Sequence, residues 1–481
     1  MTLLSRGTAI AVVLISAVFL VLDARSQSAS TDGHSGLQPA SYGLAPHPDV
    51  GTCSPAPCVL SPVWPSSSSF TADAPIAANP RNPKQLLLGS VDSDCPGVGP
   101  GFYLSSDGGF SWQQRCMPPF SYKGNEYSPI ANPLVGYDSQ GTAYEVGSYQ
   151  INDDFSSDSF VAFQKSSDGG VTWNTPAPVV GHQDSVPVYS RLAVDASPTS
   201  PFTGSVYISA VLIGPFESQS KNQLVVSHSN DGGKNWSQIA LTPVEPNNLR
   251  ELRNPSLTVG RDGTVYVTWL LCDVLQSCGS DVHLLLSRST DGGNTWSTPR
   301  SIAASNPIGW LPNTNYVEVA DTPGIATDNS NGPHAGNIYI AMYSWTGSQM
   351  RVGVIRSTDG GNTWSKPVPV APPTETHDQF FPWLSVSSTG LVGVSWMDRR
   401  NDPANVDYQA FAAISRDGGQ SFGSNVQLTT GFSDPNRGGE GNGWIGDYTG
   451  NTWAGSNFVA AWMDNSNTPG MVDVVGGIRL K

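Results

Sequence analysis

Four short stretches of the chain bring arginine, acidic residues or tyrosine close together, and these residue types bind and transform charged small molecules. They are Asp92 to Asp94, Arg250 to Arg253, Asp398 to Arg400 and Asp447-Tyr448. A guanidinium group matches a carboxylate with two parallel hydrogen bonds, so the arginines in these stretches are candidates for binding an anionic ligand. Because side chains alternate along a strand, Glu251 and Arg253 are expected on the same side of it. Arg191 is a further candidate.

Other acidic residues belong to a repeated pattern, Ser-x-Asp-Gly-Gly-x-x-aromatic. Its six copies are Ser105 to Trp112, Ser166 to Trp173, Ser229 to Trp236, Ser289 to Trp296, Ser357 to Trp364 and Ser415 to Phe422. A repeat interval of about 60 residues is typical of an array of supersecondary units. The residue types suit a tight turn, because Asp accepts hydrogen bonds from nearby backbone N–H groups and Gly-Gly permits positive φ. Equivalent aspartates on one rim cannot form one active site, so we interpret them as structural.

The elements around these turns predict an all-β fold. Each unit has an apolar strand, a Gly-containing turn, a second strand, a variable loop, a third strand that runs into the repeated pattern, and a short fourth strand. Four antiparallel strands per unit, repeated, predict a β-propeller. First strands are expected to start near Phe70, Glu126, Val186, Arg250, Val317, Gln379 and Gly443. This count favours seven blades, with six as the alternative.

The last unit ends without a fourth strand, and residues 59–64 are expected to supply it, so that both ends of the propeller share one blade. In an up-and-down sheet, the turn after the third strand and the turn after the first lie at the same end. All six repeated turns therefore lie on one rim. The long loops, the starts of the first strands and the candidate residues lie at the other end, where function is expected.

The repeated pattern resembles the Asp-box of the sialidase superfamily, also called the bacterial neuraminidase repeat, over about residues 70–481. Sialidases resemble one another in three arginines that grip the sugar carboxylate, a tyrosine nucleophile assisted by glutamate, and an aspartate acid/base. A neutral phenol does not repel an anionic sugar, which is why these enzymes depart from the usual pair of carboxylates. The Arg-Ile-Pro run that opens the first blade in this family is absent from the matching residues 70–76.

The resemblance implies one role for each candidate residue. Substrate binding falls to Arg253, Arg399 and Arg400, and catalysis to Tyr448 with Glu251 and to Asp94 as the acid. Structural roles are the alternative: ion pairs between blades for Arg399 and Asp398, pairing of Glu251 with Arg253, and packing of Tyr448 in the channel wall. We predict an exported sialidase-like glycoside hydrolase that removes a terminal acidic sugar from glycans. The alternative is a non-catalytic Asp-box propeller that binds glycans or proteins, since fold does not determine function.

The N-terminus has the layout of a secretory signal peptide, with Arg6 before an apolar run and small polar residues after it. We predict a signal peptide at 1–28, a flexible leader at 29–58 and the propeller at 59–481. A retained membrane anchor is the alternative. Three sequence-local disulfides, Cys53/Cys58, Cys95/Cys116 and Cys272/Cys278, fit an exported protein. A zinc site is the competing interpretation, but the spacings do not match one.

The formal net charge of −15 disfavours nucleic acids and anionic membranes as partners. We expect a secreted or periplasmic monomer that acts on a glycan or glycoconjugate, with no membrane contact after signal cleavage. Trp310, Trp345, Trp383 and Trp444 are candidates for stacking on sugars. No cofactor is expected. The Asp/Asn-rich residues 152–158 and 328–331 offer oxygen ligands to Ca²⁺, and solvated turns are the alternative for both.

Overall fold

The computed structural model describes residue 53 and residues 55–151, 159–181, 185–214, 221–246, 249–273, 282–438 and 444–481. The predicted signal peptide and nearly all of the predicted leader lie outside these ranges, so both remain predictions. In the part of the chain that is described, no helix is long and apolar enough to cross a membrane.

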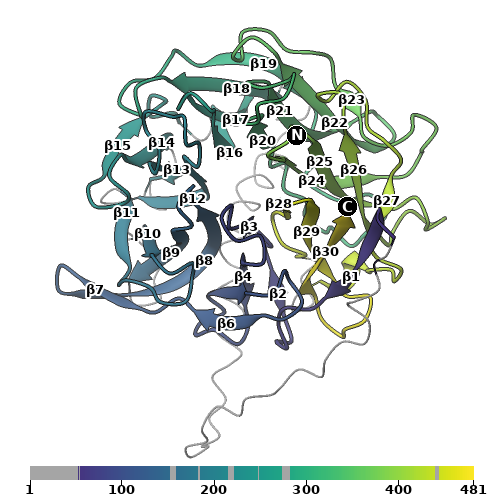
Figure 1. Ribbon diagram of the computed structural model, residues 1–481, viewed down its shortest axis with the longest axis horizontal. Coiled ribbons are helices and arrows are strands. Elements are labelled where there is room, and N and C mark those ends of the chain that lie inside the picture. Colours follow the sequence, from purple (N-terminus) through teal and green to yellow (C-terminus); the bar gives the residue numbers. More distant parts are fainter. Residues whose placement is uncertain are drawn as a thin grey trace, which may run out of the picture.

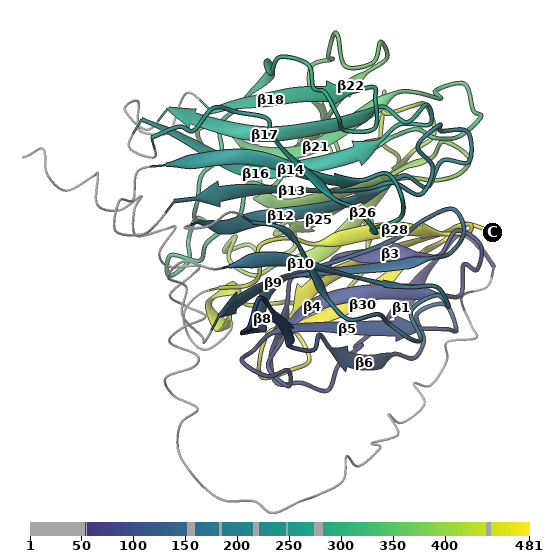
Figure 2. The same ribbon diagram turned by 90° about the vertical axis from the view of Figure 1, so that its left-hand side faces the viewer.

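Seven antiparallel sheets surround a central axis (Figure 1), and their strands run along that axis (Figure 2). The first blade contains β2 (Thr71–Ala72), β3 (Ile76–Ala78), β4 (Leu86–Asp92), β5 (Pro100–Ser105) and β6 (Gln113–Cys116). The second contains β7 (Phe120–Tyr122), β8 (Asn125–Tyr137), β9 (Ala143–Ile151), β10 (Phe160–Ser166) and β11 (Ala177–Val180). The third contains β12 (Val186–Val194), β13 (Val206–Ile213), β14 (Asn222–Ser229) and β15 (Ser237–Ala240). The seven-bladed all-β propeller predicted from the sequence is confirmed.

The remaining blades have four strands each. The fourth contains β16 (Arg250–Val259), β17 (Val265–Asp273), β18 (Val282–Ser289) and β19 (Arg300–Ser305). The fifth contains β20 (Gly324–Thr327), β21 (Ile338–Trp345), β22 (Met350–Ser357) and β23 (Val368–Pro369). The sixth contains β24 (Gln379–Val386), β25 (Val392–Asp398), β26 (Gln409–Ser415) and β27 (Val426–Gln427). The seventh contains β28 (Gly450–Ala454), β29 (Asn457–Asp464), β30 (Val472–Arg479) and β1 (Cys58–Val63).

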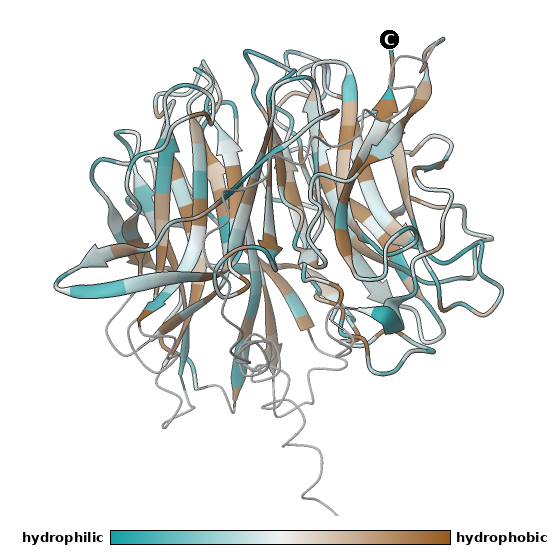
Figure 3. Cartoon of the chain, turned by 90° about the horizontal axis from the view of Figure 1, so that it is seen from below, coloured by the Kyte–Doolittle hydropathy of each residue, from teal (hydrophilic) through white to brown (hydrophobic). Residues whose placement is uncertain are grey.

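The seventh blade closes the ring because β1 is its outer strand. β1 pairs antiparallel with β30, and Val59 lies opposite Ile478. The predicted closure by the segment after the leader is therefore correct. The second strands are almost wholly buried because neighbouring blades cover both of their faces, as β25 shows at every position. Hydrophobic residues accordingly lie along the blades, whereas the loops at both ends are mostly hydrophilic (Figure 3).

Two first strands differ from the sequence expectation. The fifth blade begins with Gly324 rather than near Val317, and the seventh begins with Gly450 rather than near Gly443. The described residues between each expected start and the observed strand, 317–323 and 444–449, belong to no named strand, and the 3-10 helix η2 (Pro435–Arg437) lies earlier in the chain. In the second blade, β7 is an additional strand that projects beyond the ring (Figure 1).

The repeated pattern forms the predicted tight turn. Asp291 Oδ1 accepts hydrogen bonds from the Ser289 hydroxyl (2.8 Å) and the Thr295 backbone N–H (2.9 Å), while Oδ2 accepts the Thr295 hydroxyl (2.6 Å). Gly292 and Gly293 have φ values of 73° and 92°, which glycine adopts without strain. Trp296 donates its indole N–H to the Gly293 carbonyl (3.0 Å) and packs against the blade core. The aspartate therefore closes the turn and is not arranged for catalysis.

Disulfides pin two of the predicted loops. Cys53 is bonded to Cys58, and Cys95 is bonded to Cys116, as predicted. Cys272 is also disulfide-bonded. Its predicted partner, Cys278, lies outside the described residues.

First strands carry β-bulges close to their starts. Register shifts occur in β8, β12, β16 and β24, and within or beside them Asn132, Tyr189, Asn254 and Phe381 have positive φ. A bulge re-aims the side chains around it. The inner strands therefore present residues to the central axis at the end of the ring opposite to the Asp-box turns.

Candidate active site at the channel mouth

Titratable side chains from five blades gather where the first strands begin. We call this group the channel-mouth cluster. Its members are Asp73, Tyr189, Arg191, Glu251, Arg253, Glu318, Asp321 and Asp447, which lie within electrostatic range of one another in a continuous chain of neighbours. Asp73 separates β2 from β3, two members each lie on β12 and β16, two precede β20, and Asp447 precedes β28.

One half of the cluster is organised by Arg253 on β16. Its Nη2 lies 2.9 Å from Glu251 Oε2, and the side-chain amide of the next residue, Asn254, donates a hydrogen bond to Asp321 Oδ1 of the next blade. Burial lowers the pKa of Arg253, but the carboxylates of Glu251 and Asp321 outweigh burial and hold this pKa above its usual value. Arg253 therefore stays charged and fixes the position of Glu251.

Tyr189 lies beside this pair. Burial raises the pKa of its phenol, and the Arg253 guanidinium only partly offsets this effect. Tyr189 also has a φ of 55°, which is unusual for an aromatic residue and marks a position that the surrounding structure must hold. The structure thus places a neutral phenol beside a glutamate at the channel mouth.

The other half of the cluster surrounds Arg191, which is only 5% exposed. Its guanidinium carbon lies 4.0 Å from the centre of the Tyr448 ring. Nη1 donates to the Ser190 carbonyl (2.7 Å) and Nη2 to the Thr322 hydroxyl (3.2 Å), whereas Nε has no partner among the described residues. No carboxylate of the described residues lies within ion-pair distance of Arg191. Burial therefore lowers its pKa, and the buried charge lacks a close counter-ion.

Two acids, Asp73 and Asp447, face Arg191 from the first and seventh blades. The Asp447 backbone N–H donates to Asp73 Oδ1 (2.6 Å), and the Trp444 indole donates to Asp447 Oδ1 (3.1 Å). Burial raises the pKa of both carboxyl groups, and the charge of Asp447 raises that of Asp73 further. Neighbouring acids that are buried together favour retention of a proton by the pair.

Glu318 joins the two halves. Burial, followed by the charge of Asp447, raises its pKa to about 8, although Arg253 acts in the opposite direction. A carboxylic acid that keeps its proton at neutral pH has the property required of a general acid.

Glu318 is carried by a hairpin-like segment, residues 309–319. The Val319 N–H donates a hydrogen bond to the Gly309 carbonyl (3.0 Å), and Trp310 and Glu318 form an isolated antiparallel β-bridge. Two aromatic side chains on this segment, Trp310 and Tyr316, are exposed by 38% and 79% and meet edge to face with their ring centres 6.0 Å apart. The segment therefore brings an exposed aromatic pair close to the raised-pKa acid.

Of the predicted site residues, Glu251 and Arg253 lie together in the cluster. Tyr448 stacks against Arg191, is 3% exposed, and donates a hydrogen bond to the Pro133 carbonyl of the second blade (3.2 Å). This placement corresponds to the channel-wall packing considered as the alternative for Tyr448. Its hydroxyl is occupied by a backbone carbonyl instead of by Glu251.

Arg399 and Arg400 lie in separate networks from Arg253. Arg400 makes two hydrogen bonds to Asp398, of 2.9 and 2.5 Å, and a third to Asn425. Arg399 is fully buried, donates to the Pro312 carbonyl (2.8 Å) and lies 3.4 Å from Asp378. The structure does not bring the three predicted arginines together, because local acids hold two of them.

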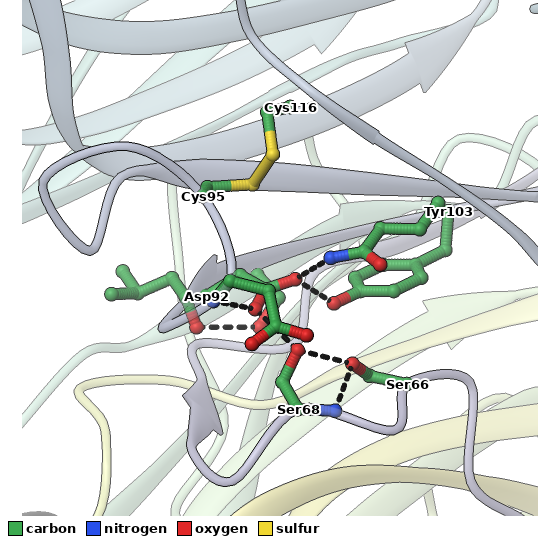
Figure 4. The surroundings of a disulfide bond; sticks show 10 residues. Ser66, Ser68, Asp92, Cys95, Tyr103 and Cys116 are labelled. Carbon is green, nitrogen blue, oxygen red and sulfur yellow. Dashed lines mark hydrogen bonds between the residues drawn. A yellow bond between two sulfur atoms is a disulfide. The ribbon is translucent and has the colours of Figure 1, made fainter. Parts of the chain in front are cut away.

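Asp94 lies on the loop between β4 and β5, at the same end of the ring as the cluster. Its side chain is exposed and makes no hydrogen bond among the described residues, while its backbone N–H donates to Asp92 (2.8 Å). Asp92 is buried next to the Cys95–Cys116 disulfide, where Ser68 (2.6 Å) and Tyr103 also donate to it (Figure 4). Asp92 anchors the loop, and Asp94 is not in contact with the cluster.

Sequence reasoning did not select Asp73, Tyr189, Glu318 or Asp321. Asp73 lies in the stretch 70–76, which lacks the Arg-Ile-Pro run, and Asp321 precedes a Thr-Pro pair directly before β20. A search for every polar residue at a first-strand start finds Asp73, Tyr189 and Asp321. Glu318 follows the start that was expected near Val317, but the strand begins at Gly324, so Glu318 lies in the loop before it.

Of the two loops considered for Ca²⁺ binding, the structure describes only residues 328–331. Residues 152–158 lie outside the described residues. In the other loop, the Arg261 guanidinium binds the Ser330 carbonyl and Asn331 Oδ1, each at 3.0 Å. Within the described ranges no group of three or more His, Cys, Asp or Glu is arranged to hold a metal. The expectation of no cofactor, with Ca²⁺ in these loops as the alternative to solvated turns, is not tested by the structure.

Comparison with known proteins gives one family match. Residues 247–442 match the BNR repeat-like domain. Similar solved structures include the Hadza microbial sialidase Hz136, with 15% identity, a TM-score of 0.44 and coverage of 83% of this chain and 75% of that one. They also include the α-L-arabinofuranosidase Arb93A of Fusarium graminearum, with 15% identity, a TM-score of 0.49 and coverage of 74% of this chain and 98% of that one. A third is the Trypanosoma rangeli sialidase, with 15% identity, a TM-score of 0.41 and coverage of 77% of this chain and 55% of that one.

Proposed function

We propose that this BNR-repeat propeller is a glycoside hydrolase that removes a terminal acidic sugar, and that the reaction takes place at the channel-mouth cluster. The observation that carries the proposal is the presence in one cluster of Arg191, a buried guanidinium with no close carboxylate among the described residues, and Glu318, whose pKa is raised to about 8; both interact electrostatically with Asp447. The first offers a charge to an anionic sugar, and the second offers a proton to a leaving group.

Arg191 is the proposed carboxylate-binding residue. Its Nε is buried without a partner among the described residues, and a substrate carboxylate supplies the counter-ion that the protein does not. The Tyr448 ring beneath it and the Thr322 hydroxyl beside it restrict its orientation. This assignment replaces the predicted grip by Arg399 and Arg400, which are held by Asp378 and Asp398.

Glu318 is the proposed general acid, because it keeps its proton at neutral pH and donates it to the glycosidic oxygen as the bond breaks. We place this role on Glu318 and not on Asp94, which lies outside the cluster. The exposed rings of Trp310 and Tyr316 border Glu318 along the same segment and offer a surface to the leaving group. Arg399 supports this segment through the Pro312 carbonyl.

Tyr189 is the proposed nucleophile and Glu251 its base. The predicted partner of Glu251 was Tyr448, but the Tyr448 hydroxyl bonds to Pro133, whereas the Tyr189 phenol lies in the electrostatic field of Glu251. Attack by the neutral phenol oxygen forms a bond to the anomeric carbon as Glu251 takes the phenol proton. Water then hydrolyses the glycosyl-tyrosine intermediate.

The test is an assay of the purified protein on a fluorogenic sialoside and on a panel of neutral glycosides. We expect turnover of the sialoside, its loss in Tyr189→Phe, and a raised KM in Arg191→Gln. Tyr316→Phe is the matched control, because it removes an exposed hydroxyl from the same face without removing the nucleophile. Full activity of Tyr189→Phe with unchanged thermal stability contradicts the nucleophile assignment.

A non-catalytic glycan-binding propeller is the second candidate, favoured by one observation. Arg253 is already neutralised by Glu251, so only Arg191 is left to grip an anionic sugar. Absence of turnover on every glycoside, together with glycan-array binding that Arg191→Gln weakens, supports this candidate.

We also propose that the chain is exported. The two disulfides support this proposal because such bonds persist in oxidising compartments. Determination of the N-terminal residue of the protein recovered from the producing cells tests cleavage after the predicted signal peptide at 1–28.

A further inference from the structure

A pocket of about 240 Å³ lies at the seam between the sixth and seventh blades, away from the channel-mouth cluster. The closing strand β1 and the residue after it contribute Ser61, Pro62 and Trp64. The loop after β27 contributes Thr430, and the loop after β29 contributes Ser466 and Asn467. Both loops lie at the same end of the ring as the channel mouth.

The lining combines an apolar surface with neutral polar groups. Pro62, Trp64 and Val474 supply the apolar part. The hydroxyl and amide side chains of Thr430 and Asn467 make no hydrogen bond within the described structure, so both are available to a ligand. None of the described residues that line the pocket is a lysine or arginine, which disfavours an anionic ligand.

One buried acid gives this pocket a defined shape. Asp464 is 2% exposed and lines the pocket. Its Oδ1 accepts hydrogen bonds from the Ser466 hydroxyl (2.6 Å) and the Ser466 backbone N–H (2.8 Å). Ser466 is therefore fixed by its own carboxylate partner, and the pocket is formed before any ligand arrives.

We propose that this seam pocket binds a neutral pyranose unit of a glycan. A sugar ring offers an apolar face to Trp64 and Pro62 and several hydroxyl groups to the polar side chains, which is the composition that the pocket presents. The volume lies below the roughly 300–1,000 Å³ of pockets for drug-sized ligands, which fits a single ring. The site is independent of hydrolysis and can hold a neutral part of a glycan on the face that carries the channel mouth.

Occupancy of the seam pocket is coupled to closure of the ring. Three of its residues belong to β1 or follow it directly, and β1 completes the seventh blade only by pairing with β30. A ligand that binds only when β1 is docked stabilises that pairing by mass action. Sugar binding is therefore expected to slow opening of the closing strand.

The experiment is saturation-transfer difference NMR on the purified protein with the methyl glycosides of glucose, galactose and N-acetylglucosamine. We expect transfer to at least one glycoside, with about tenfold weaker affinity in the double variant Thr430→Val/Asn467→Ala, since two hydrogen bonds are lost. These residues are exposed and free of internal side-chain bonds, so the fold is retained. Thr374→Val, an exposed threonine outside the pocket, is the matched control.

Hydrogen exchange supplies a second readout. Amides of residues 59–63 should exchange more slowly when the sugar is bound, and this protection should disappear in the double variant. The Glu318→Gln variant should bind the sugar like the unmodified protein, which separates this proposal from the proposed hydrolase. Absence of transfer to all three glycosides, equal transfer in the double variant, or unchanged exchange of β1 with bound sugar each overturns the proposal.

Discussion

The surroundings of the two propeller rims shift the pKa of several acidic residues in opposite directions. On the Asp-box rim, hydrogen bonds to each carboxylate lower its pKa, to about 2 for Asp168 and Asp359. At the channel mouth, burial raises the pKa of Glu318 to about 8, and also raises those of Asp73 and Asp447. Surroundings, and not residue type, therefore decide which acids hold charge and which hold protons.

The rims also differ in how their geometry is specified. The six copies of the turn repeat the same hydrogen bond from the serine hydroxyl to the aspartate carboxylate. This bond is 2.8 Å long between Ser105 and Asp107 in the first copy and 2.7 Å long between Ser415 and Asp417 in the last. At the mouth the contacts are not repeated: Arg253 pairs with Glu251 on its own strand, whereas Asn254 and Asp447 bond to residues of other blades. A repeated local structure suits a scaffold, whereas unlike residues that converge from several blades suit one site.

The largest expected effect is the loss of activity in Glu318→Gln. Removal of a general acid typically lowers the rate by about 10²–10⁴-fold. Asp291→Asn, an Asp-box control, should leave kcat within about twofold, which is small against that range. The measurement is kcat and KM on a natural acidic disaccharide, whose leaving group needs protonation, from pH 4 to 9; the unmodified enzyme should lose activity on the alkaline side as Glu318 deprotonates near pH 8.

The leaving group of the substrate provides a second check on the role of Glu318. A substrate with a good leaving group needs less protonation, so Glu318→Gln should lose less rate on an aryl glycoside than on a natural disaccharide. An equal loss on both substrates would falsify the assignment of Glu318 as the acid.

The second effect is a difference in pH dependence of stability. The folded-state pKa of Glu318 lies above its usual 4.5, so stability falls as pH rises from about 4.5 to about 8, by up to about 1.4 kcal/mol per pH unit. Asp168 has a lowered pKa, so its contribution is complete above 3.8 and is lost as pH falls towards 2. Because Asp168 is exposed, that contribution is small.

Thermal unfolding between pH 2 and 9 measures the contributions of Glu318 and Asp168 to stability. Glu318→Gln should reduce the loss of Tm between pH 5 and 8, and Asp168→Asn should reduce the loss below pH 4. If Glu318→Gln leaves the alkaline slope of Tm unchanged, the mouth acids do not hold protons in the folded protein.

The scaffold could be predicted from the sequence because its signals are local. The first strands expected to start near Val186, Arg250 and Gln379 do start there, as β12, β16 and β24, since the apolar pattern and the neighbouring turns define them. The closing strand was predicted because the last unit lacked a fourth strand. Both inferences need only the repeat interval of the chain and the residue types of its turns.

The site could be predicted only in part because its contacts are not local. Glu251 and Arg253 share one strand and were identified together. The bond between Asn254 and Asp321 depends on how two blades pack, and Tyr448 bonds to Pro133 of a blade far away in the sequence. The sequence suggested that Arg400 could bind a substrate carboxylate, but its guanidinium donates hydrogen bonds to Asp398, two residues earlier. Convergence of side chains across blades was not visible in the linear order.

The third effect is on the Asp-box rim itself. Asp291→Ala removes the acceptor of the Thr295 backbone N–H and of two hydroxyl groups, and a comparable loss at a helix cap costs about 1 kcal/mol. We expect a lower Tm and unchanged KM. A variant with unchanged Tm but reduced activity would reverse the roles assigned to the two rims.

The smallest effect concerns hydrogen bonds that join neighbouring Asp-box turns. Lys165 donates to the Gly232 carbonyl (2.7 Å), Arg288 to that of Gly360, and Arg356 to that of Gly418 (3.2 Å). In each case the basic residue precedes the serine of one turn, and the carbonyl belongs to the first glycine of the next blade's turn. This contact links the rim from blade to blade.

Replacement of Arg288 by Met keeps most of the aliphatic stem and removes the donor, so it should cost about 1 kcal/mol and lower Tm slightly. Arg288→Lys should recover most of that loss, because Lys165 makes the same contact in the second blade. Arg300→Met, an exposed arginine on β19, is the matched control and should leave Tm unchanged. Equal Tm values for Arg288→Met and Arg288→Lys would show that the stem, and not the hydrogen bond, joins the blades. A rim held by packing alone would then differ from the channel mouth in its type of interaction as well as in its regularity.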